Sequence, residues 1–113
     1  MIKRISFIRR KQGMSEDEFF EHWTGTHADI VRQMPGVRGL RFGRVRSWNP
    51  EGARWDGVGE LWFDSVEAAL AAFATEPFAS MLVEDRKKFM GELQSCFVEE
   101  TTVIAPPHGR PVG

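Results

Sequence analysis

The chain has 113 residues and a formal net charge of −1 at pH 7, with 15 basic and 16 acidic side chains. This length suits one domain with a real hydrophobic core, and the balanced charge argues against nucleic-acid binding. The single cysteine, Cys96, excludes an intrachain disulfide, and its apolar surroundings suggest a small core residue. Because the sequence shows neither a long apolar run nor a signal peptide, we expect a cytoplasmic protein with no membrane partner.

The first predicted element is a strand at 2–9, followed by a polar turn and a helix that begins after Ser15. Ser15 and Glu18 form a capping-box pattern, and Pro35 with Gly36 ends the helix. The apolar stripe of this helix contains Phe20, Trp23, His27, Ile30 and Met34, with Phe19 and Val31 beside it. A histidine therefore lies on the apolar face of an amphipathic helix, one turn beyond a tryptophan.

His27 has two interpretations. A histidine on an apolar stripe is often a core residue whose ring nitrogens bond to a carbonyl or a hydroxyl group, and it can instead be the functional group of a pocket. His22 is expected at the surface, and His108 lies in a tail rich in proline and glycine. Since no second His, Cys or carboxylate shares ligand spacing with His27, we expect no metal.

The second half of the chain continues the alternation of strands and helices. The expected elements are strands at 37–47 and 55–64 on either side of a turn, helices at 64–77 and 78–90, and a strand at 94–104. Asp64 is expected to cap the first of these helices. Its stripe is expected to contain Val66, Leu70 and Phe73, and Gly91 is expected to close the second helix.

The order strand, helix, strand, strand, helix, strand predicts a ferredoxin-like α+β fold. In that arrangement a four-stranded antiparallel sheet carries its helices on one face. The domain is expected to span 1–105, and 106–113 forms a C-terminal tail.

The strand at 55–64 is apolar on both of its faces. Val58 and Trp62 point to one face, and Gly59, Leu61 and Phe63 point to the other. Because an antiparallel sheet with one solvated face alternates apolar and polar side chains, we expect a second copy of the chain to cover the Val58 and Trp62 face in a homodimer. Glu60 lies between them, as a hydrogen-bonded interface group or as an acid in a site.

Three stretches carry a resemblance to a known family: KQGMSEDEFFEHWTGTHADIVRQMPGVRG, DGVGELWFDSVEAALAAF and FVEET. In this order and spacing they resemble the EthD-type branch of the dimeric α/β-barrel proteins, over residues 2–101. The resemblance implies protomers that pair sheet to sheet, each with a small apolar pocket between helices and sheet. It also implies that no metal or organic cofactor is needed. The histidine that recurs in the pocket of such proteins matches His27, which favours the functional interpretation.

The resemblance implies proton-transfer chemistry on a hydrophobic aromatic or lactone-type substrate, in catabolism or polyketide tailoring. Decarboxylation, isomerisation and oxidation all occur among such proteins. The chain departs from the lactone isomerases at Leu40 and Leu61, where they carry tyrosine and cysteine, and it has no tyrosine at all. A second proton-transfer group for isomerisation is therefore lacking. Because burial disfavours imidazolium, we expect His27 to be a neutral base.

Two functions from different classes follow. The first is a cofactor-free enzyme with His27 as its catalytic acid and base; the second is a non-catalytic ligand-binding or accessory protein of a degradation pathway. Two or more polar groups near His27 would favour catalysis, whereas an isolated ring would favour ligand carriage. A haem-linked role is a distant third, because dimeric α/β barrels include haem enzymes.

The predicted substrate-binding side chains are apolar, and each could equally be part of the core. They are Phe7, Phe20, Trp23, Leu40, Phe42, Leu61 and Phe63. Four arginines of the second strand region could bind a substrate carboxylate or lie in solvent. They are Arg38, Arg41, Arg44 and Arg46.

Overall fold

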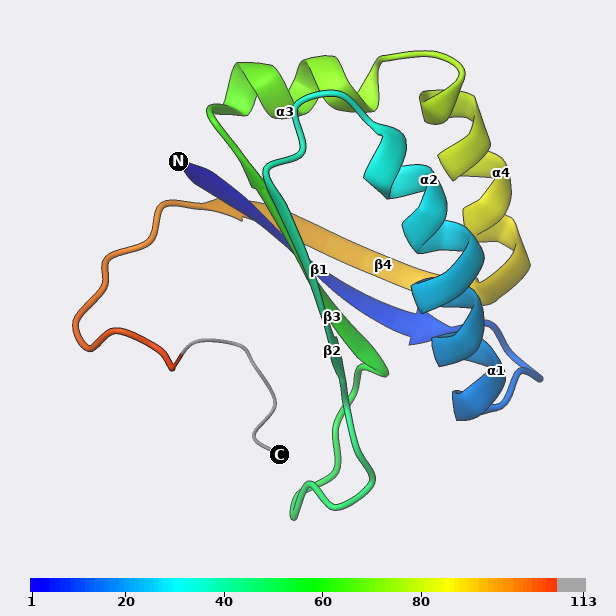
Figure 1. Cartoon of the computed structure of the whole chain (residues 1–113). Coiled ribbons are helices and arrows are strands. Elements are labelled where there is room, and N and C mark those ends of the chain that lie inside the picture. Colours follow the sequence, from blue (N-terminus) through cyan, green and yellow to red (C-terminus); the bar gives the residue numbers. More distant parts are fainter. Residues whose placement is uncertain (108–113) are drawn as a thin grey trace.

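Four antiparallel strands form one sheet in the computed structural model, which describes residues 1–107. β1 (Ile2–Arg10) lies inside the sheet between β3 (Gly57–Phe63) and β4 (Met90–Val98), and β2 (Gly39–Arg44) forms the edge beyond β3. All helices lie on one face of this sheet (Figure 1). The ferredoxin-like α+β fold expected from the sequence is confirmed.

The first helical segment consists of three consecutive pieces. They are α1 (Glu16–His22), a π-helical turn (Trp23–His27) and α2 (Ala28–Gln33). Ser15 Oγ accepts from the Glu18 N–H at 3.1 Å, and Glu18 Oε1 accepts from the Ser15 N–H at 3.1 Å, so the capping box is confirmed. In the wide turn the Ala28 N–H donates to the carbonyl oxygen of Trp23, five residues earlier.

The second helical region consists of α3 (Val66–Phe73) and α4 (Phe78–Phe89). Ser65 caps α3 by accepting from the Ala68 N–H, so the prediction that Asp64 caps this helix is wrong. The expected stripe is also wrong at Leu70, which is 58% exposed. Ala69 and Ala72 are the buried residues of α3, because these small side chains let the helix pack closely on the core.

β4 begins directly after α4, so Gly91 lies in the strand and does not close the helix as expected. A Cβ atom at Gly91 would lie 2.7 Å from the carbonyl oxygen of Arg10, where the register between β1 and β4 shifts. Glycine therefore permits a close backbone approach at this bulge. The strand ends at Val98, six residues before the expected end, and residues 99–107 run past the sheet without a helix or strand (Figure 1).

The face of the sheet away from the helices is called here the open face. Its apolar side chains include the half-buried Ile5, Phe7, Val58 and Trp62. Cys96 pairs with Ile5 in the register and is exposed, so the prediction of a core cysteine is wrong. Alternation along β4 directs Cys96 away from the helices.

No single helix within residues 1–107 is long and apolar enough to cross a bilayer. α3 and α4 reach the required length and composition only together, and they are bent by 76° at their junction. Of the expected tail at 106–113, residues 108–113 lie outside the described part of the chain, and the prediction for His108 lies there as well.

Candidate active site

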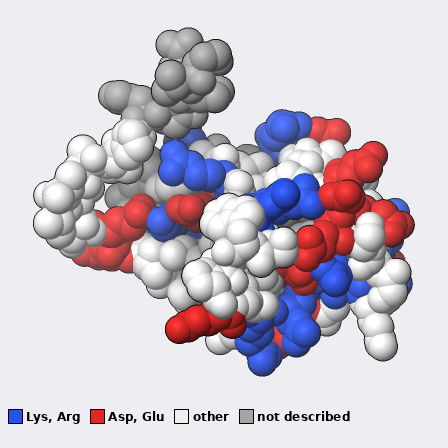
Figure 2. Space-filling view, turned by 90° about the horizontal axis from the view of Figure 1, so that it is seen from below, with Lys and Arg blue, Asp and Glu red and all other residues white. Residues whose placement is uncertain are grey.

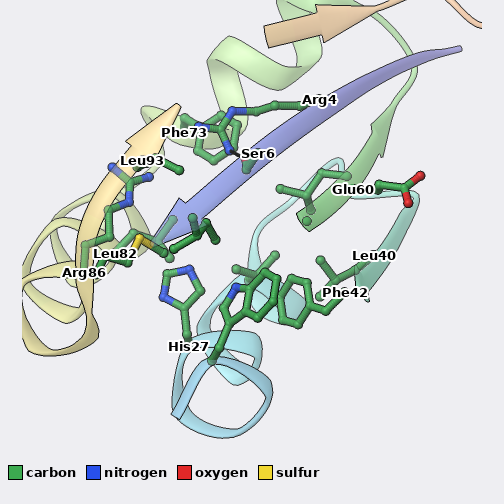
Figure 3. A pocket seen from close by; sticks show the side chains of 16 residues that line it. Arg4, Ser6, His27, Leu40, Phe42, Glu60, Phe73, Leu82, Arg86 and Leu93 are labelled. Carbon is green, nitrogen blue, oxygen red and sulfur yellow. Dashed lines mark hydrogen bonds between the residues drawn. The ribbon is translucent and has the colours of Figure 1, made fainter. Parts of the chain in front are cut away.

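A cavity of about 40 Å³ lies between the helices and the sheet. Its apolar walls include Trp23, Leu40, Phe42, Leu61, Leu82 and Leu93, and its polar lining comes from Arg4, Ser6, His27 and Arg86 (Figure 3). A cavity that holds a benzene ring measures about 150 Å³. A substrate of that size therefore fits only after lining side chains move.

His27 is held by a buried carboxylate from α4. Its Nδ1 lies 3.0 Å from Asp85 Oδ2, and the other carboxylate oxygen, Oδ1, lies 2.9 Å from His22 Nε2. His27 is 6% exposed and Asp85 is 3% exposed. The π-helical turn and α4 thus bring together two imidazoles and one carboxylate that lie far apart in the sequence.

The hydrogen bonds assign the tautomer of His27. Asp85 Oδ2 accepts, so Nδ1 of His27 carries the hydrogen and Nε2 carries a lone pair. No fully buried side-chain nitrogen or oxygen in the described part of the chain lacks a hydrogen-bond partner. Nε2 makes no bond within residues 1–107, and it must therefore contact accessible space, which at this ring is the cavity.

Burial sets the protonation state of His27. Desolvation lowers the pKa of the imidazole below its ordinary value, and the hydrogen bond and charge of Asp85 oppose this effect without reversing it. The positive charge of Arg86 and the neighbouring His22 lower the pKa further. His27 is therefore a neutral imidazole at pH 7, with its basic nitrogen at the cavity.

The surface position predicted for His22 is wrong, and Asp85 was not singled out from the sequence. His22 was expected at the surface, yet only 22% of its side chain is exposed and it bonds to Asp85. Asp85 was not a candidate, because it lies in the charged run EDRKK, which is typical of a solvated helix face. Its spacing from Leu82 and Phe89, both buried, is the signal that could have placed it on the inner face of α4.

Trp23 forms a fixed wall beside His27. Its indole stacks on Phe42, with ring centroids 4.1 Å apart and planes 14° from parallel. A Cβ atom at Gly57 would lie 2.4 Å from the indole, so the ring rests directly on the backbone of β3. Trp23 is 1% exposed, and one of its faces is already occupied by Phe42.

The structure brings together five of the eight predicted site residues. Trp23, His27, Leu40, Phe42 and Leu61 line the cavity. The other three lie elsewhere. Phe7 is on the open face beside Trp55, Phe20 is on the flank of α1 beneath Arg44, and Phe63 is fully buried against Phe73.

None of the four candidate arginines lines the cavity. Arg38 pairs with Asp64 and Arg44 with Asp17, Arg41 lies over the Trp62 ring on the open face, and Arg46 is exposed. Figure 2 shows basic and acidic side chains interleaved over the face it presents. Exposed ion pairs such as Arg38 with Asp64 contribute little to stability. None of the four arginines is placed to contact a ligand in the cavity.

Glu60 borders the cavity, but its carboxylate points away from it (Figure 3). Glu60 Oε2 accepts from Lys3 Nζ at 2.8 Å, and the same ammonium donates to Glu100 at 2.8 Å. This pairing agrees with the interpretation of Glu60 as a hydrogen-bonded structural group. Within residues 1–107, no three His, Cys, Asp or Glu side chains form a metal-ligand set.

The fold and the internal cavity place the chain among ferredoxin-like α+β proteins with a site between helices and sheet. Residues 11–92 match the EthD domain, and the chain belongs to this family. An EthD-family protein from Bacillus halodurans is 27% identical, with a TM-score of 0.75, and the match covers 89% of this chain and 99% of that one.

Two further solved structures share the fold. A dimeric protein of ferredoxin-like fold from Bacteroides fragilis is 15% identical, with a TM-score of 0.65, over 88% of this chain and 95% of that one. A hydroxynitrile lyase from Passiflora edulis is 15% identical, with a TM-score of 0.69, over 92% of this chain and 96% of that one. No curated protein matches the chain by sequence.

Proposed function

We propose that the protein is a cofactor-independent enzyme that transfers a proton on a small hydrophobic substrate, of aromatic or lactone type, with His27 as acid and base. The observation that carries the proposal is the buried pair of His27 and Asp85, with Nε2 of the imidazole left free at an apolar cavity. A neutral imidazole oriented by a carboxylate is suited to general base catalysis.

The chemistry begins with proton transfer from a substrate carbon or hydroxyl group to His27 Nε2. The resulting imidazolium is stabilised by the Asp85 carboxylate at 3.0 Å, and His22 keeps that carboxylate in position at 2.9 Å. The negative charge left on the substrate is stabilised by the cationic Arg86, which lines the same cavity. Return of the proton from Nε2 to another atom of the substrate completes the cycle.

Catalysis is favoured over ligand carriage by the number of polar groups around His27. Asp85 bonds to its ring, and Arg4, Ser6 and Arg86 share its cavity. Burying a carboxylate and an imidazole is unfavourable, and an apolar carrier pocket does not need them. The hydroxynitrile lyase of similar structure supports the proposal that this fold can hold a lyase or a related enzyme.

The proposed enzyme is a homodimer that acts in the cytoplasm. The open face carries half-buried apolar side chains, and the Trp62 indole N–H donates to Glu100 of the segment after β4 at 3.2 Å. A large apolar patch on a protein surface is typical of an interface. A protein of similar structure is dimeric. Pairing of two open faces buries this surface and leaves the cavity, on the other side of each sheet, to its own protomer.

The test uses His27→Gln and His27→Ala, with Thr26→Ala at the exposed neighbouring position as the matched control. A substrate is first sought by tryptophan fluorescence with phenols, anthrones and unsaturated lactones, with Trp23→Phe to identify the signal from the cavity. With an identified substrate, both His27 variants should lose about 10²–10⁴ in turnover, whereas the control should not.

Melting temperatures measured on the same samples separate catalysis from packing. A residue that serves only the core lowers stability when it is replaced, while activity per folded molecule survives. A folded His27→Gln protein with wild-type turnover would end the catalytic proposal.

A further inference from the structure

The ten arginines within residues 1–107 fall into three groups by partner and exposure. Most of them have a carboxylate partner within 4 Å. These are Arg9, Arg10, Arg32, Arg38, Arg44 and Arg54. Arg41 and Arg46 have no such partner within residues 1–107, but both are exposed to solvent. Arg4 and Arg86 also lack one, yet they are half-buried, and they are the two arginines that line the cavity. The half-buried guanidinium groups without a carboxylate partner are thus found where a ligand would lie.

Arg4 is held in place by neutral groups only. Its Nη1 donates to Ser6 Oγ at 2.9 Å, its Nη2 donates to Ser95 Oγ at 3.0 Å, and the guanidinium lies 4.8 Å from the centre of the Phe73 ring. These contacts orient the group without neutralising its charge. A guanidinium held in this way retains further N–H donors for an anion.

The side chain of Arg86 makes no hydrogen bond or ion pair to any residue in the described range. It reaches the cavity from α4, one position after Asp85, and its head lies on the same side of the cavity as that of Arg4 (Figure 3). Burial lowers the pKa of Arg4, of His27 and of Arg86 itself, and the positive charge of Arg86 lowers the pKa of Arg4 and His27 further. Two half-buried cations without a counter-ion are electrostatically unfavourable, and an anion bound between them relieves this.

We infer that Arg4 and Arg86 form a carboxylate-binding site, and that the substrate is a small apolar carboxylic acid whose carbon skeleton extends from this site toward Nε2 of His27. The guanidinium pair binds the carboxylate oxygens, since planar N–H forks match that geometry. Leu82 and Leu93 contact the apolar part. The orientation toward His27 rests on the proposed function, whereas the binding of a carboxylate does not.

The site also restricts the reaction. A carboxylate held by two guanidinium groups is stabilised most as a full anion, so its loss as CO₂ would weaken binding on the way to the transition state. The anchored carboxylate therefore persists through the reaction, and the proton moves at another carbon of the substrate. Isomerisation or elimination in which His27 alone takes up and returns the proton fits this arrangement, and decarboxylation of the anchored group does not.

The test compares carboxylates with their neutral amides of the same shape: crotonate with crotonamide, and benzoate with benzamide. Binding to the full-length protein is measured by calorimetry and by the shift in melting temperature. The wild type should bind at least one of the carboxylates about tenfold or more tightly than its amide, because hydrogen bonds to charged groups are the strong ones.

Arg86→Gln is the primary variant, since it breaks no hydrogen bond or ion pair within the described structure. It should remove most of the preference for the carboxylate, and Arg4→Gln should do the same if its fold is intact. The matched control is Arg46→Gln, which removes one exposed positive charge outside the cavity and should keep the preference. Arg86→Lys, which keeps the charge without the fork, should restore part of it.

Three results would overturn the inference: equal binding of carboxylate and amide, failure of every carboxylate to bind, or an unchanged preference in Arg86→Gln. The outcome is independent of turnover. If carboxylates bind through Arg86 while His27→Gln retains full turnover, the anion site stands and the proposed catalytic role fails. If the preference is absent while His27→Gln is inactive, only the anion site fails.

Discussion

The two faces of the sheet differ in how they hold polar groups. On the helix-covered face the largest buried side chains are Trp23, Phe19, Phe63 and Phe89, and three polar residues, Ser6, His27 and Asp85, are buried beside them. On the open face the polar pair Lys3 and Glu60 is partly accessible, and the apolar side chains are only half-buried.

This difference distinguishes the proposed reaction site from the proposed assembly surface. Buried polar groups oppose folding unless they are hydrogen-bonded, and on the helix face their bonds converge on one cavity without saturating His27. On the open face Lys3 pairs with Glu60 and Glu100, and the neighbouring surface consists of half-buried apolar side chains. Loss of a polar group should therefore affect chemistry on one face, and gain of a charge should affect assembly on the other.

Among substitutions other than those of His27 itself, Asp85→Asn is expected to lower turnover the most. The amide keeps the shape but cannot stabilise the imidazolium, so turnover should fall about 10²-fold or more. Glu84→Gln, at the exposed neighbouring position on α4, is the control and should leave turnover unchanged. Turnover is measured together with the melting temperature. Wild-type turnover in folded Asp85→Asn would show that the pair is structural only.

The next effect concerns assembly, and it is tested by Val58→Glu. Val58 lies on the open face opposite Phe7 of β1, and a charge there would be buried without a partner in the dimer. The dissociation constant of the dimer should rise by about 100-fold or more, at an estimated 3–5 kcal/mol for an uncompensated buried charge.

Leu70→Glu provides the matched comparison, because Leu70 is exposed on α3 and lies in the helix layer. Sedimentation velocity at micromolar concentration should find dimers for the wild type and for this control, and monomers for Val58→Glu. A monomeric wild type, or a Val58→Glu dimer of unchanged affinity, would contradict the assignment of the open face to assembly.

The smallest expected effect is the dependence of stability on pH. The pKa of His27 is lower in the folded protein than its ordinary value of about 6.5, because burial disfavours the charged ring. Between about pH 6.5 and the lower pKa of the folded protein, His27 therefore binds a proton in the unfolded chain but not in the folded one. The free energy of unfolding falls as the pH is lowered through this range and levels off below it. Chemical denaturation at several pH values should show this fall in the wild type and a weaker one in His27→Gln. The same slope in both proteins would exclude His27 as its source.

Local signals in the sequence predicted much of the fold and half of the site. The Ser15 and Glu18 capping box, the order of strands and helices, and the placement of His27 on an inward helix face all depend on residues close together in the chain. The strand at 55–64 was predicted to have two apolar faces. In the structure Leu61 and Phe63 are buried on the helix side of β3, and Val58 and Trp62 are half-buried on its open face. The predictions failed where small residues take buried positions, as Ala69 and Ala72 do in place of Leu70.

The other half of the site depends on contacts between distant parts of the chain. Asp85 lies 58 residues from His27 and 63 residues from His22, so no local pattern joins them. Arg4 follows Lys3 near the start of a strand, and two consecutive basic residues there are ordinary for a position near solvent. Only the packing of α4 against the π-helical turn brings Asp85 to His27, and only the folded sheet places Arg4 at the cavity that His27 lines.

The π-helical turn determines which side chains share a line along the helix. In a regular α-helix, positions four residues apart drift by about 40° around the axis, so a series of four would spread over about 120°. Phe19, Trp23, His27 and Val31 form such a series, and all four are buried. The π-helical turn has more residues per turn than an α-helix, so it reverses part of this rotation. His27 therefore lies in the middle of a row of buried core residues. The position of the imidazole at the cavity therefore depends on the winding of the backbone at this turn, and a single change of helical pitch would move the ring away from both the cavity and Asp85.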